Sequence, residues 1–190
     1  MTIPMLQVKI NSVALKFSVS IIQIENKFDE RGLAFVKKNI YIYLKSIPNI
    51  NLTLIQDVDG WIKDILKLEV ETWTLLSEEM NKIISIFNNY NELIVNTLED
   101  IYSNDEVTVL GSDWVNKMDA LIAVAVAMKN LGEYAAERIQ EEKDLDYNAF
   151  MSVMDLQDNM FANCRKDFKV FLKKSYKFIT NILKLYHRRS

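Results

Sequence analysis

The side chains that most often carry out protein chemistry are scarce in this chain. Its 190 residues include one histidine, His187, and one cysteine, Cys164. His187 stands beside two arginines close to the end of the sequence, where it cannot anchor the base of a catalytic triad or a histidine-containing zinc site. Cys164 lies within a helical apolar pattern, which favours a small buried hydrophobic residue over a reactive thiol.

Carboxylates are the remaining candidates for chemistry. Glu133, Glu137 and Glu141 recur at every fourth residue, so they share one face of a helix and could bind a cation. Di-metal bundles instead use inward Glu-x-x-His motifs, and no glycine-rich loop here could cradle a phosphate. We therefore expect a solvated acidic face, no metal or other cofactor, and no enzymatic activity. A looser acidic group at helical spacing consists of Glu92, Glu99 and Asp100.

The most informative feature is the segregation of charge. Residues 165–190 contain nine Lys or Arg and one acid, whereas the preceding 164 residues contain fourteen bases and 25 acids. Aromatic and aliphatic residues recur among these bases at helical spacing, which predicts a basic amphipathic helix. The candidate binding residues share its polar stripe: Lys166, Lys169, Lys173, Lys177, Lys184 and Arg188.

This basic helix has several interpretations. Its apolar stripe, including Phe168, Phe171 and Phe178, fits the core side of a bundle, which would leave the lysines solvated. An acidic pole of the same bundle could then neutralise them in part. The lysines could instead bind an acidic protein, an anionic membrane surface or a nucleic acid. Nucleic acid is the least favoured, because the rest of the chain is acidic. The residues of the acidic pole would be Glu92, Glu99, Asp100, Asp105, Glu106 and Asp113.

Helices are needed to position these residues. The chain contains only four glycines and two prolines, which disfavours β-sandwiches and nucleotide-binding α/β folds. Between Ile62 and Ile101, apolar residues recur at alternating intervals of three and four, with interruptions at Glu69 and Thr97. A helix over about 59–102 would be about 60 Å long, as in an extended bundle.

The sequence therefore predicts one all-α domain over 1–190, an elongated up-and-down four-helix bundle. Pro48 should end the first helix, and 49–57 should cross over in an extended form. Residues 103–111 should form a loop, with Ser112 as the N-cap of the third helix. Gly132 and Ala135 should allow close backbone approach. The expected helices are about 5–46, 58–103, 112–143 and 147–187.

Residues 5–56 also fit a small β-hairpin layer. Apolar residues at 13, 15, 17, 19 and 21 alternate as they would in a strand, and strand propensity is high there. Polar residues at 16, 20, 23 and 27 follow helical spacing, and no turn signal separates 13 from 30. We therefore favour a helix.

We expect a non-enzymatic protein-interaction module whose basic C-terminal helix orients it toward an acidic partner. A homo-oligomer is a related expectation, because a second copy could satisfy a long heptad seam. The first alternative is a membrane-active protein or a component of a pore-forming assembly, and the second is a nucleic-acid-binding protein. The longest apolar run, 120–128, is far shorter than the roughly 20 residues of a membrane span.

The expected compartment is the cytoplasm, because the sequence has no cleavable signal pattern and a single cysteine. The mature form of an exported protein, or one exported without a cleaved signal, would carry the same features.

Overall fold

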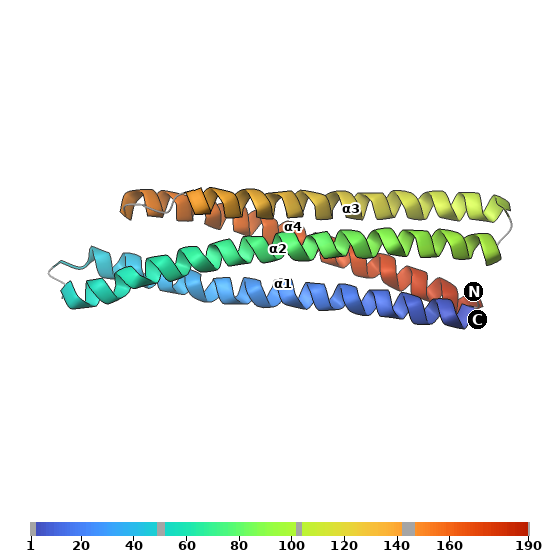
Figure 1. Cartoon of the computed structure of the whole chain (residues 1–190), viewed down its shortest axis with the longest axis horizontal. Coiled ribbons are helices and arrows are strands. Elements are labelled where there is room, and N and C mark those ends of the chain that lie inside the picture. The colour runs from blue at the N-terminus through green and yellow to red at the C-terminus, as the bar shows by residue number, and fades with distance from the viewer. Residues whose placement is uncertain (1–2, 49–51, 102–103, 142–146, 190) are drawn as a thin grey trace.

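The computed structural model contains four long helices in up-and-down order (Figure 1). It describes residues 3–48, 52–101, 104–141 and 147–189, with side chains described at most positions within 8–48, 63–92, 113–141 and 155–184. The predicted all-α bundle is confirmed, and within the described part of 5–56 the backbone is helical rather than a hairpin. The helices are α1 (Ile3–Ser46), α2 (Leu52–Ile101), α3 (Asn104–Glu141) and α4 (Tyr147–Arg189).

Two helix starts differ from the prediction. Leu52 already begins α2, so the expected extended crossover over 49–57 is wrong from Leu52 onward. Nothing between Leu52 and Asp59 breaks a helix. Asn104 begins α3, and Gly111 and Ser112 are helical rather than a loop end and an N-cap. A glycine inside a helix costs only about 1 kcal/mol relative to alanine, and the packing of a long helix outweighs that cost.

The core is an aromatic and aliphatic seam contributed by all four helices. On α2, the predicted seam residues from Trp73 to Tyr90 are almost completely buried. Aromatic rings from α1, α2 and α4 meet at the centre: the centroids of Phe28 and Phe161 are 5.0 Å apart, and those of Phe17 and Phe87 are 5.5 Å apart. The first contact joins α4 to α1, and a third, with 6.2 Å between the centroids of Phe87 and Phe171, joins α4 to α2.

Small residues on α3 allow it to lie very close to α2. A Cβ atom added to Gly132 would lie 2.6 Å from the backbone oxygen of Trp73, so only glycine fits there without a shift of the backbone. Ala125 and Ala135 are fully buried on the same side of α3. The sequence-based expectation of close approach near Gly132 and Ala135 is therefore confirmed.

The fourth helix is placed differently from the other three. In Figure 1, α1, α2 and α3 run nearly along the long axis, and α4 crosses behind them to end beside the N-terminus. Correspondingly, α2 packs closely along α1 and α3, whereas α4 makes looser contacts with α3 and α1. This oblique path leaves space between α3 and α4.

Candidate functional site

An apolar groove of about 790 Å³ lies between α3 and α4. On α3 it extends from Trp114 to Leu131, and on α4 from Cys164 to Asn181, which is about 26 Å along each helix. Three alanines of α3, Ala120, Ala123 and Ala127, line it and are too short to fill the space. The groove thus follows from small side chains on α3 facing an obliquely placed α4.

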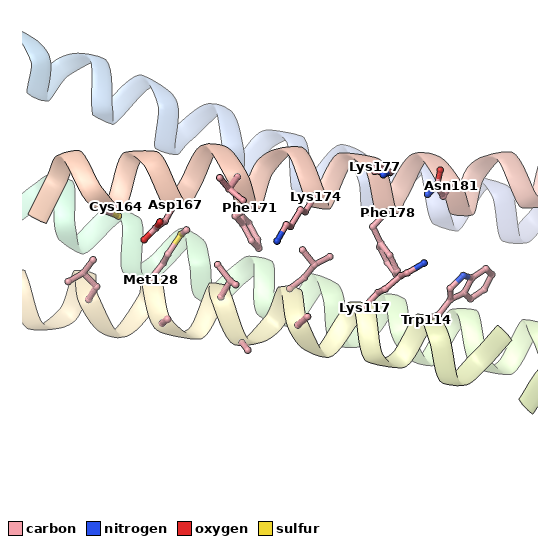
Figure 2. Close-up of a pocket in the computed structure, with 17 residues that line it drawn as sticks. Trp114, Lys117, Met128, Cys164, Asp167, Phe171, Lys174, Lys177, Phe178 and Asn181 are labelled. Carbon is pink, nitrogen blue, oxygen red and sulfur yellow. The ribbon is translucent and has the colours of Figure 1, made fainter. Parts of the chain in front are cut away.

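The polar groups of the groove are unevenly distributed along its length. Figure 2 shows Phe171, Lys174 and Phe178 extending from α4 toward α3, with Lys117 and Trp114 near one end and Asp167 near the other. Lys117 forms an ion pair with Asp113 of its own helix, with 2.9 Å between Nζ and Oδ2. The three lysines that line the groove, Lys117, Lys174 and Lys177, therefore lie toward the Trp114 end, and Asp167 lies toward the other end.

The predicted lysine stripe faces solvent on the side of α4 opposite the core. Lys166, Lys169, Lys173, Lys177 and Lys184 are exposed, and the side chain of Arg188 lies outside the described residues. Only Lys177 of this set lines the groove. The spacing argument missed Lys174, which also lines it, because this residue lies at the edge of the stripe.

The expected neutralisation of this stripe by acids of the same bundle is not found among the described side chains. Within that part of the chain, no ion pair joins Lys166, Lys169, Lys173, Lys177 or Lys184 to a carboxylate. Glu92 is exposed and Asp113 pairs with Lys117. The side chains of Glu99, Asp100, Asp105 and Glu106 lie outside the described residues.

Cys164 lines one end of the groove and is buried. Burial, together with the nearby Asp167 carboxylate, raises the pKa of its thiol to about 12. The thiol therefore remains protonated at neutral pH and is a poor nucleophile.

A second polar cluster is buried between α1, α2 and α4. Arg31 forms ion pairs with Glu69 at 2.7 Å and with Asp158 at 2.9 Å, and Lys38 also pairs with Asp158. The guanidinium of Arg31 lies 3.9 Å from the ring centroid of Phe161. Periodicity alone missed this cluster, because the charged residue at Glu69 interrupts the apolar pattern of α2.

The three carboxylates predicted to share one face of α3 face solvent. Glu133, Glu137 and Glu141 are exposed, and Glu133 accepts a hydrogen bond from Ser77 and lies 3.8 Å from Lys129. Among the described residues, no three His, Cys, Asp or Glu side chains come together as metal ligands. Within the residues that the structure describes, no helix is both long enough and apolar enough to cross a membrane.

Comparison of the chain with protein-family models, curated proteins and solved structures gives no match.

Proposed function

We propose that this protein is a non-enzymatic interaction module whose α3/α4 groove binds an acidic amphipathic helix of a partner protein. The observation that carries this proposal is an apolar groove about 26 Å long with lysines at its rim. A helix of about 17 residues has that length, and helix-in-groove recognition needs an apolar floor of this kind.

Charge complementarity favours an acidic partner. Lys174 and Lys177 line the groove, and neither forms an ion pair with another described residue. The exposed stripe of Lys166, Lys169 and Lys173 continues the positive surface over α4. Such a surface steers an acidic partner to the groove and repels a basic one. The lysine-rich end of the groove would receive the acidic end of the partner helix, away from Asp167.

A synthetic probe tests this function. The probe is a fluorescently labelled helical peptide of about 17 residues, with leucines on one face and glutamates on the other. The control peptide has lysines in place of the glutamates. We expect the full-length protein to bind the acidic peptide in a fluorescence-anisotropy titration and the basic peptide much more weakly. Because the rim is charged, added salt should weaken binding. Absence of acidic-peptide binding at low salt would refute the proposal.

Matched variants locate the binding site. Lys174→Glu with Lys177→Glu should weaken binding by about tenfold, on the order of 0.7 kcal/mol for each exposed charge. Lys166→Glu with Lys169→Glu makes the same charge change outside the groove and should have a smaller effect. Equal losses in both variants would mean that the peptide binds the charged surface without using the groove.

The apolar floor needs a separate test. Ala123→Trp places a large side chain into the groove, whereas Ala162→Trp places the same side chain on the exposed side of α4. Filling the groove should reduce binding of the acidic peptide, and the Ala162 variant should bind like wild type. Unchanged binding by the Ala123 variant would place the peptide elsewhere.

A further inference from the structure

The first helix carries a second apolar row on the side that faces away from the core. Its residues are 42–68% exposed, and they account for eight of the fourteen exposed large hydrophobic residues in the described part of the chain. Single exposed apolar residues are ordinary, but several along one face of a helix are a feature of interaction surfaces. We call this set the outer row: Val8, Leu15, Val19, Ile22, Leu33, Val36, Ile40 and Tyr43.

The outer row has the spacing of a coiled-coil seam. Its members are separated by three, four or seven residues, except for Ile22 and Leu33, which are eleven apart. The exposed polar residues Asn26 and Asp29 occupy the two seam positions between them. Buried residues such as Phe17, Ile21 and Ile24 stand two positions after Leu15, Val19 and Ile22. Two residues correspond to a rotation of about 200°, so the two rows lie on opposite sides of α1.

Between Leu15 and Ile40 the outer row is symmetric about its own centre. Reversal about the midpoint between residues 27 and 28 exchanges Leu15 with Ile40 and Val19 with Val36. The same reversal exchanges Ile22 with Leu33, and Asn26 with Asp29. A surface that matches its own reversed copy is suited to a two-fold interface, in which each subunit contributes the same patch. The match is one of residue types as well as spacing, because the two polar positions exchange with each other and apolar positions exchange with apolar ones.

We propose that the outer row is a homodimer interface, in which α1 of one copy packs antiparallel on α1 of a second copy. Between Leu15 and Ile40, apolar residues then face apolar residues on both sides of the centre, and the central Asp29 carboxylate of each copy accepts a hydrogen bond from the Asn26 amide of the other. The proposal uses a surface distinct from the α3/α4 groove and stands independently of the proposed partner helix.

Charge selects the antiparallel orientation. A parallel pair in register would place the two Asp29 carboxylates opposite each other at the centre of the interface. The antiparallel pair instead places each Asp29 opposite Asn26 of the other copy, which avoids that like-charge contact. A shallow groove of about 780 Å³ between α1 and α2, lined in part by Leu15, Val19 and Ile86, adjoins the row and extends the contact surface.

Sedimentation velocity of the full-length protein tests the dimer. Wild type should be dimeric, and Ile22→Glu or Leu33→Glu should shift it to a monomer because each puts two charges into the apolar contact. Leu156→Glu on α4, another exposed leucine, should leave the dimer unchanged. Circular dichroism should give wild-type helicity for all three variants, because every substituted side chain is exposed. A monomeric wild type at every concentration, or a dimer that persists in both row variants, overturns the proposal.

Cysteine cross-linking tests the orientation. Ile22→Cys and Leu33→Cys proteins are unfolded and refolded together, then mildly oxidised. The antiparallel pair predicts a disulfide-linked dimer in the mixture and none in either variant alone, while native Cys164 stays buried. A cross-link of Ile22→Cys with itself, or none in the mixture, overturns the arrangement. Binding of monomeric wild type to phosphatidylcholine vesicles, lost in Leu33→Glu, would identify a membrane as the occupant and also overturn it.

Discussion

The Nε atom of Arg31 on α1 lies 2.7 Å from Oε1 of Glu69 on α2, and both side chains are buried. A second contact from Arg31, to Asp158 at 2.9 Å, extends the pair to α4. Because both charges are buried among mainly apolar residues, a shift of α1 by one turn would leave each of them buried without its partner. The pair therefore fixes the alignment of three helices more than it adds net stability.

Replacing Arg31 with an uncharged residue should strongly destabilise the folded protein. Arg31→Met leaves the Glu69 carboxylate buried without its partner, so the free energy of unfolding should fall by about 3 to 5 kcal/mol in urea denaturation. Lys27→Met provides the control, because Lys27 pairs with the exposed Glu30 and Glu71 and its loss should cost less than about 1 kcal/mol. Similar losses in the two variants would show that the buried pair has no special role.

The double variant Arg31→Met with Glu69→Leu should recover part of the stability lost by Arg31→Met. Both buried charges are then absent from the α1/α2 contact, although Asp158 loses its arginine partner. A double-mutant cycle measures this coupling. Strictly additive losses would contradict an energetic link between Arg31 and Glu69.

Glu69 should also give stability a distinctive pH dependence. Burial raises the pKa of Glu69 above its ordinary value of 4.5, although Arg31 acts in the opposite direction. The folded protein therefore binds this proton more readily than the unfolded chain does. It follows that the contribution of Glu69 to stability decreases as the pH rises from 4.5 through the raised pKa.

The measurement compares unfolding free energies of wild type and Glu69→Gln at a series of pH values. The stability of wild type relative to the variant should be greatest at and below pH 4.5 and should fall as the pH rises through the raised pKa of Glu69. Glu71→Gln shows the effect of removing an exposed carboxylate. If wild type gains stability over Glu69→Gln with rising pH, the assigned direction of the pKa shift is wrong.

The strand-like alternation of the first helix has a structural explanation. Leu15 and Val19 belong to the outer row, and Phe17 and Ile21 belong to the core, so consecutive odd positions fall alternately on opposite faces of α1. A helix with two apolar faces and a strand with one apolar face give the same local pattern. Helical spacing of polar residues decided correctly between them, although Ser20 of that stripe is buried.

The buried cluster could have been predicted only by comparing helices. Periodicity treats Glu69 as an interruption of the α2 seam, and it treats Arg31 and Lys38 as interruptions of α1. Opposite charges inside the seams of neighbouring helices indicate a buried pair, but their alignment depends on the helix offsets. The α3/α4 groove could not be predicted from the sequence either. Helical spacing places Lys174 on a helix, but it does not give the path along which α4 crosses the other helices.

The close contact of α2 with α3 predicts opposite effects for two glycine-to-alanine substitutions. Gly132→Ala should destabilise the protein by about 1 to 3 kcal/mol, because its Cβ would lie 2.6 Å from the Trp73 backbone oxygen and 3.1 Å from the Ser77 nitrogen. Gly32→Ala should stabilise it by about 0.5 to 1 kcal/mol, because nothing lies within 4 Å of the added Cβ in α1. Urea denaturation checks both, and stabilisation by Gly132→Ala would contradict the close approach of the helices.

The thiol of Cys164 should resist alkylation in the folded protein. Its pKa is raised to about 12 and its side chain is buried, so both the thiolate fraction and the access of reagent are low. Iodoacetamide at mildly alkaline pH, followed by mass spectrometry, should modify the protein in urea and leave the native form unmodified. Because Cys164 also lines the α3/α4 groove, rapid labelling of the native protein would mean that α4 separates from α3 in solution, and that the groove is wider than the structure gives.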